Sequence, residues 1–100
     1  MVATAPNLTL IAGRLAATRP STAFPGWAEA DVVLDVVEAV PGLACLVRSR
    51  PGDTVTVAVA PGLLPPEPAG CGIRCRVAVT PSGLRAEPHP TQEHFSLSQP

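Results

Sequence analysis

Hydrophobic and polar residues alternate along most of this chain with a period of two, most clearly over residues 28–40. Within that segment Glu29, Asp31 and Asp35 fall on one face, and the residues of the other face are small or apolar. Such alternation is typical of a strand that packs one face on a core and exposes the other to water. A helix would scatter both sets around its axis, so the pattern predicts a strand over residues 28–40.

The same alternation recurs between groups of turn-forming residues. It predicts further strands over residues 7–15, 54–60, 73–80 and 84–88, an extended segment over 43–50 and a short strand around 95–97. Residues 61–68 hold four prolines, which remove backbone donors and restrict the residues before them. A rigid connecting loop is therefore expected at 61–68.

Five or six short strands in a chain of 100 residues favour a small closed barrel, because closure removes the exposed strand edges that promote aggregation. The sequence therefore predicts an all-β, five- to six-stranded antiparallel OB-fold (Greek-key) barrel over residues 7–88. Residues 1–6 are expected to form an N-terminal arm, and residues 89–100 a C-terminal tail that carries the short extra strand. Two alternatives stay open for residues 43–50, which are a barrel strand and a projecting hairpin arm.

Composition narrows the class of protein further. The formal net charge is −1 and all seven basic residues are arginine, so nucleic-acid binding would need arginines gathered on one face. Neither a leader segment nor a long apolar run is apparent, so a soluble cytoplasmic protein without a membrane partner is expected. The cysteines, Cys45, Cys71 and Cys75, fit neither a disulfide framework nor a zinc site. They are interpreted as buried thiols, with a redox pair of Cys71 and Cys75 as the alternative.

The first predicted strand carries a motif, in which Asn7 begins an alternating run that ends in Gly13-Arg14-Leu15. This spacing resembles the first strand of bacterial single-stranded DNA-binding proteins and their primosomal relatives. The segment Gly52-Asp53-x-Val55-x-Val57 is similar to a later strand of the same family. The resemblance implies an OB barrel in which the proline-rich loop replaces the family's helix. It also implies a homo-oligomer that binds single-stranded DNA in replication, recombination or repair.

Candidate nucleic-acid contacts are outward arginines together with one aromatic residue. They are Arg14, Arg19, Arg48, Arg50, Arg74 and Arg76, with Trp27 as a platform on which an unpaired base stacks. The alternative for these arginines is cross-strand ion pairing with Glu29, Asp31 and Asp35 on a solvated surface. Because the chain has only three aromatic residues, the second functional hypothesis is an OB-like protein-interaction module that binds no nucleic acid. In this hypothesis the apolar, low-charge barrel surface and the proline-rich loop dock a partner or another copy of the chain.

Catalytic chemistry has no anchor in this sequence. No serine lies in a nucleophile elbow, and the two histidines, His89 and His94, lie in a segment broken by proline. The sequence therefore predicts a non-catalytic protein with no metal, no cofactor and no small-molecule substrate.

Overall fold

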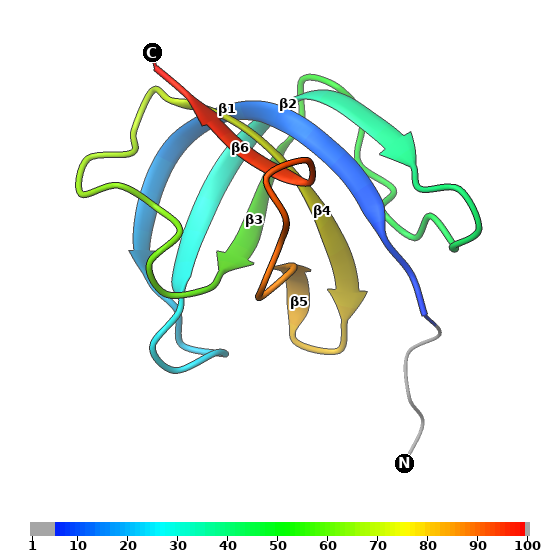
Figure 1. The fold of residues 1–100 in the computed structure, drawn as a ribbon, viewed down its shortest axis with the longest axis horizontal. Helices are drawn as coiled ribbons and strands as arrows, with labels where there is room; N and C mark the ends of the chain where they lie inside the picture. Colours follow the sequence, from blue (N-terminus) through cyan, green and yellow to red (C-terminus); the bar gives the residue numbers. More distant parts are fainter. Residues whose placement is uncertain (1–5, 100) are drawn as a thin grey trace.

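The computed structural model of this chain describes residues 6–99, which form six strands and no helix. The strands are β1 (Thr9–Pro20), β2 (Ala28–Ala39), β3 (Thr54–Val59), β4 (Gly72–Thr80), β5 (Gly83–Ala86) and β6 (Phe95–Ser98) (Figure 1). They pair in the order β1-β2-β3-β5-β4, β4 also pairs with β1 to close the barrel, and β6 adds to β4. The predicted small OB-like barrel is confirmed. One of its pairs, β3 with β5, is parallel, whereas the prediction was of an antiparallel barrel.

The barrel interior is filled by the apolar residues of the alternating pattern. Ile11, Leu15, Val32, Leu34 and Val57 each expose at most 1% of their surface. Burial of one such side chain stabilises a fold by about 1.5–3 kcal/mol. The alternation therefore places one continuous core inside the barrel and leaves the outer face of each strand for polar side chains.

The proline-rich loop joins β3 to β4 and covers part of the core. Its residues Leu63 and Leu64 pack against the buried cluster. After the prolines the backbone rejoins β1, since the Gly70 N–H donates to the Leu15 carbonyl at 2.7 Å and the Leu15 N–H donates to the Cys71 carbonyl at 2.8 Å. Two leucines of this irregular loop thus pack against the core, in the part of the chain where the proline-rich loop is expected to replace the family's helix.

Gly13 marks the point where β1 passes closest to β2. A Cβ atom at this position would lie 2.1 Å from the carbonyl oxygen of Val33. The pairing between β1 and β2 shifts register between Ala12 and Gly13 and again between Leu15 and Ala17. Bulges of this kind bend a strand and increase its twist, and they accompany the bend that lets β1 pair with both β2 and β4.

Residues 43–50 form neither a barrel strand nor a hairpin arm, so both alternatives for this segment are wrong. The segment lies against the barrel, where the Ala44 carbonyl accepts from the Leu8 N–H at 3.2 Å and Val47 packs on the core. The adjacent part of β1, residues 9–14, is paired on both edges, with β2 and with β4. Residues 43–50 form no ladder with any strand of the described chain, and their one bridge there joins Ala44 to Asn7. The chain rejoins β2 only at Gly52, whose N–H donates to the Leu34 carbonyl at 2.7 Å.

The C-terminal strand β6 pairs with residues 72–75 of β4, while β5 pairs with residues 77–80 of the same strand. A strand is therefore present where the sequence indicates a short one around 95–97. Most of the expected N-terminal arm, residues 1–5, lies outside the described residues. Among residues 6–99 there is no helix with the length and apolar character needed to cross a membrane.

Candidate functional site

The loop between β1 and β2 holds two aromatic rings in contact. The ring centroids of Phe24 and Trp27 lie 5.6 Å apart with their planes tilted by 35°. Both backbone polar groups of Trp27 are used, because its N–H donates to the Phe24 carbonyl at 3.0 Å and its carbonyl accepts from the Ser21 N–H at 2.9 Å. The half-buried indole is therefore carried by a fixed turn, and its own N–H has no acceptor among residues 6–99.

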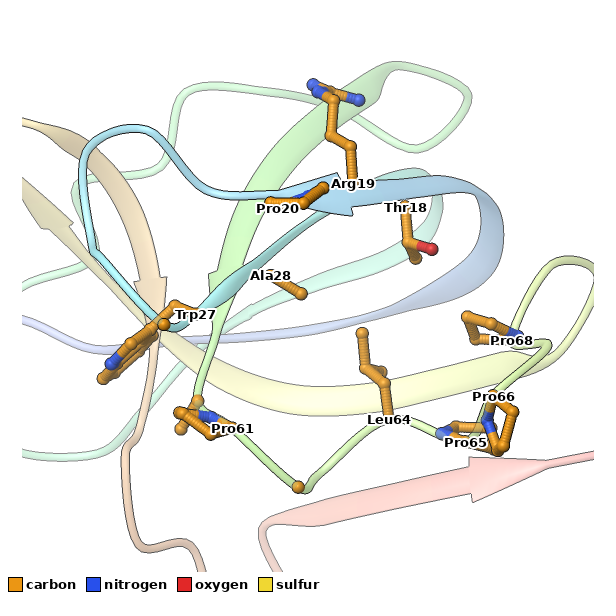
Figure 2. Close-up of a pocket in the computed structure, with 13 residues that line it drawn as sticks. Thr18, Arg19, Pro20, Trp27, Ala28, Pro61, Leu64, Pro65, Pro66 and Pro68 are labelled. Carbon is orange, nitrogen blue, oxygen red and sulfur yellow. The ribbon is translucent and has the colours of Figure 1, made fainter.

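Two hollows meet at Trp27. The first has a volume of about 600 Å³ and lies between the end of β1 and the proline-rich loop, with Pro20, Leu64, Pro65, Pro66 and Pro68 among its lining residues. In Figure 2, Leu64 and Thr18 point toward each other across this space, whereas the guanidinium of Arg19 points away from it.

The second hollow, of about 640 Å³, lies on the other side of the same residues. It shares Trp27, Ala60 and Pro61 with the first hollow and is otherwise lined by Leu63, Pro88, His89 and Pro90. We refer to the two hollows together as the proline groove. Trp27 and Pro61 line both hollows, and further proline rings line each of them.

Arg19 is the only arginine, lysine, aspartate or glutamate among the residues that line the proline groove, and its charge is already paired. Its guanidinium donates to both carboxylate oxygens of Asp31, at 3.0 and 3.2 Å, and to Glu29 at 3.1 Å. Hydrogen bonding to Asp31 raises the pKa of Arg19. Hydrogen bonds from Arg19 and then from Thr56 lower the pKa of Asp31. The groove therefore offers a ligand no unpaired fixed charge.

The structure separates the predicted arginines into three sets. Arg19 and Arg76 are ion-paired. The guanidinium of Arg76 donates two hydrogen bonds to the carboxylate of Glu87, one of them at 2.7 Å, and this hydrogen bonding raises the pKa of Arg76. Arg48 and Arg50 lie on the irregular connection between β2 and β3 and share no strand face. Arg14 and Arg74 lie on the outer faces of β1 and β4. Of the predicted arginines, only Arg19 pairs with the carboxylates that the alternative named, whereas Arg76 pairs with Glu87, which it did not name.

No residue lines both the proline groove and the hollows beside Arg14 and Arg74. The outer face of β2 carries Glu29, Asp31 and Asp35, so the β2–β3 face on which OB barrels commonly bind oligonucleotides is acidic here. The structure therefore brings Trp27 together with prolines and not with the unpaired arginines.

The cysteines occupy different environments, and all three are free thiols. Cys75 is buried in the core, and this burial, followed by the nearby Glu87, raises its pKa to about 12. Cys45 and Cys71 are half-buried. A redox pair needs thiols with a low pKa and access to solvent, so the geometry of Cys75 favours the interpretation of a packing residue.

We expect Cys75 to resist alkylation by iodoacetamide in the folded protein at mildly alkaline pH, because its thiolate is disfavoured and the core excludes the reagent. The half-buried Cys45 and Cys71 should react before Cys75, and all three thiols should react after unfolding in urea. Mass spectrometry of the labelled peptides measures this. Equal labelling of Cys75 and Cys71 in the folded state would contradict it.

Sequence reasoning missed how the prolines are grouped around Trp27. The interaction-module hypothesis names the proline-rich loop at 61–68 as a docking surface, but it includes neither Trp27 nor the prolines at 88–90 in that surface. Their convergence depends on the barrel, which places the β3–β4 loop and the segment after β5 beside the β1–β2 loop.

Comparison with known proteins adds no family assignment. No protein-family model, curated protein or solved structure matches this chain. Among the described residues, no three histidine, cysteine, aspartate or glutamate side chains come together in a way that could hold a metal ion.

Proposed function

We propose that this chain is a non-catalytic OB-like binding module whose proline groove docks an extended, uncharged, proline-rich segment of a protein partner. The observation that carries this proposal is the position of Trp27 between two hollows lined by proline and leucine. Grooves lined by aromatic rings bind polyproline II segments, whose conformation is already formed before binding and so loses little entropy.

The hydrogen-bonding capacity of the groove supports the same ligand. A polyproline segment has carbonyl acceptors but no backbone N–H donors. The indole N–H of Trp27 has no acceptor within residues 6–99, so it is available to a ligand carbonyl. The groove needs no charged ligand, because its arginine is already held by Asp31 and Glu29.

The fixed conformation of the groove also favours binding. The turn that carries Trp27 is held by three hydrogen bonds, two between backbone groups and one from the Phe24 N–H to the Ser21 hydroxyl at 3.0 Å. The opposite wall is made of prolines, whose backbone angle φ is locked by the ring. A surface that is already ordered loses less conformational entropy when a ligand binds.

Trp27 is the single tryptophan, so its fluorescence reports directly on the groove. We expect a proline decamer to change the emission of Trp27 saturably, and a glycine–serine decamer to leave it unchanged. Trp27→Phe removes the N–H and the fluorophore, so its loss of affinity is measured by calorimetry with the proline decamer.

Pro66→Asp tests the same groove with a charge. Pro66 is exposed and lines the first hollow, so a carboxylate there should weaken binding of the decamer. The matched control is Leu43→Asp, which adds the same charge at an exposed leucine outside both hollows. A decamer that produces no change, or that binds the Pro66→Asp variant as tightly as the unaltered protein, would reject the proposal. Quenching by oligothymidylate alone would favour single-stranded DNA binding at Trp27 instead.

A further inference from the structure

Arg14 and Arg74 lie diagonally across the β1–β4 pair. The register sets Arg14 opposite Gly72 and Ala12 opposite Arg74, so each arginine faces a residue without a side chain beyond Cβ. Diagonal neighbours on an antiparallel pair are about 7–8 Å apart, within the reach of long side chains. The two guanidiniums can therefore converge on one ligand from adjacent strands.

Two shallow hollows, of about 450 and 350 Å³, lie beside these arginines. They share Gly13, Asp35, Gly72 and Ser98, so they form one depression that crosses β2, β1, β4 and β6. We call this depression the glycine trough after Gly13 and Gly72, which line both of its hollows. A side chain at Gly13 would point at the Val33 carbonyl, and one at Gly72 would meet the Ser98 hydroxyl. Arg14 lines one hollow and Arg74 lines the other.

Neither arginine forms an ion pair with any residue of the described part of the chain, although Asp35 lines the same trough. Arg19 and Arg76 are held by carboxylates, whereas Arg48, Arg50 and Arg85 resemble Arg14 and Arg74 in having no ion pair within the described residues. Two neighbouring guanidiniums repel each other, and an anion between them turns that repulsion into attraction. Charge-assisted hydrogen bonds from arginine to phosphate are among the strongest available to a protein surface.

Strand β6 places further donors at one end of the trough. Ser96 is opposite Arg74 and Ser98 is opposite Gly72, and both serines are exposed. Gln99 follows and lines the same hollow as Arg14. Hydroxyl and amide groups donate to phosphate oxygens as readily as to water. The end formed by β4 and β6 is thus rich in donors.

The opposite end carries the carboxylate of Asp35, the extra residue of the bulge between β1 and β2. A carboxylate repels a phosphate placed beside it but accepts a hydrogen bond from a hydroxyl or an amine. The trough therefore fits a phosphate whose next chemical group is a donor, which is the arrangement that a nucleotide offers through its sugar and base.

We propose that the glycine trough is a binding site for the phosphate group of a nucleotide, with Arg14 and Arg74 holding the phosphate and Asp35 accepting from the sugar or base. This site is separate from the proline groove and does not depend on the function proposed for that groove. The phosphate has two possible sources, a free nucleotide or a single-stranded nucleic acid, and both present the same group to the two arginines.

Backbone amide shifts of Gly72, Ser96 and Ser98 in NMR titrations test this site. The probes are inorganic phosphate, thymidine monophosphate and oligothymidylate, each added to the whole chain at constant ionic strength. We expect saturable shifts at these amides with the monophosphate. Arg14→Ala and Arg74→Ala should each weaken its affinity about tenfold, the value expected for losing one charge-assisted hydrogen bond.

Arg50→Ala is the matched control, because it removes the same charge from an exposed arginine that lines neither hollow of the trough. Its affinity should stay unchanged. Oligothymidylate that binds more tightly than the monophosphate, with a salt dependence that falls in Arg74→Ala, identifies nucleic acid as the source. Equal affinity for both identifies a free nucleotide. The absence of saturable shifts with all three probes, or an equal loss in Arg50→Ala, overturns the proposal.

Discussion

Gly13→Ala should destabilise the barrel by about 3 kcal/mol, near the upper end of what overpacking costs in protein cores. The added methyl group would lie 2.1 Å from the Val33 carbonyl oxygen and 3.0 Å from a side-chain carbon of Val32. Both neighbours belong to β2, so relief requires the two longest strands to move apart. Since small domains are stable by about 5–15 kcal/mol, urea denaturation should show a large fall in midpoint.

The matched control for this substitution is Gly72→Ala, a glycine on the adjacent strand β4. A Cβ atom at Gly72 would meet the hydroxyl of Ser98, whose side chain can rotate away, and would otherwise lie 3.7 Å or more from its neighbours. We expect Gly72→Ala to cost less than about 1 kcal/mol, within the range of ordinary surface changes. Equal destabilisation by both variants would mean that loss of glycine, and not the approach of β2, determines the effect.

The barrel strands were predictable from the sequence, whereas the close contact at Gly13 was not. Alternation of apolar residues reports which face of a strand is buried, and it located the five barrel strands without knowledge of their pairing. Gly13 was visible in the sequence as a glycine within a strand, which often marks a bulge or a close approach of backbones. The neighbour it approaches, the Val33 carbonyl, became known only from the way β1 packs beside β2, where Gly13 itself is paired with Leu34.

Residues 43–50 show where this reasoning fails. Their pattern is compatible with a strand, but a strand also needs an edge with which to pair, and residues 43–50 make only one bridge within the described chain, from Ala44 to Asn7. Whether a strand edge is available for pairing depends on the whole sheet, so it cannot be inferred from the eight residues of this segment. The segment is therefore ordered by single contacts, such as those of Ala44 and Val47, without a ladder of its own.

The ion pairs of Arg19 depend on a β-bulge at Ala16. The register changes between Leu15 and Ala17, so that Arg19 lies opposite Glu29. If Ala16 were paired in register with Asp31 and did not form a bulge, Arg19 would lie opposite Ala28, one strand position farther from both Glu29 and Asp31. A bulge cannot be located from alternation alone, so the sequence identified the candidate arginines but not which of them the fold pairs.

Asn7, which begins the motif that ends in Gly13-Arg14-Leu15, has a structural role that substitution can test. Its side chain is buried and bonds to both backbone groups of Val79, accepting from the N–H at 2.8 Å and donating to the carbonyl at 3.2 Å. Asn7→Ala removes both bonds and should cost about 2–3 kcal/mol in urea denaturation, since the groups left behind are poorly hydrated.

Asn7→Asp keeps the acceptor, while its ionised carboxylate would face the Val79 carbonyl. That contact raises the pKa of the introduced carboxyl in the folded state, so the variant should gain stability relative to the unaltered protein as the pH falls and the carboxyl becomes a donor. A cost for Asn7→Asp that is the same at every pH would show that the side-chain amide does not join β4 to the start of β1.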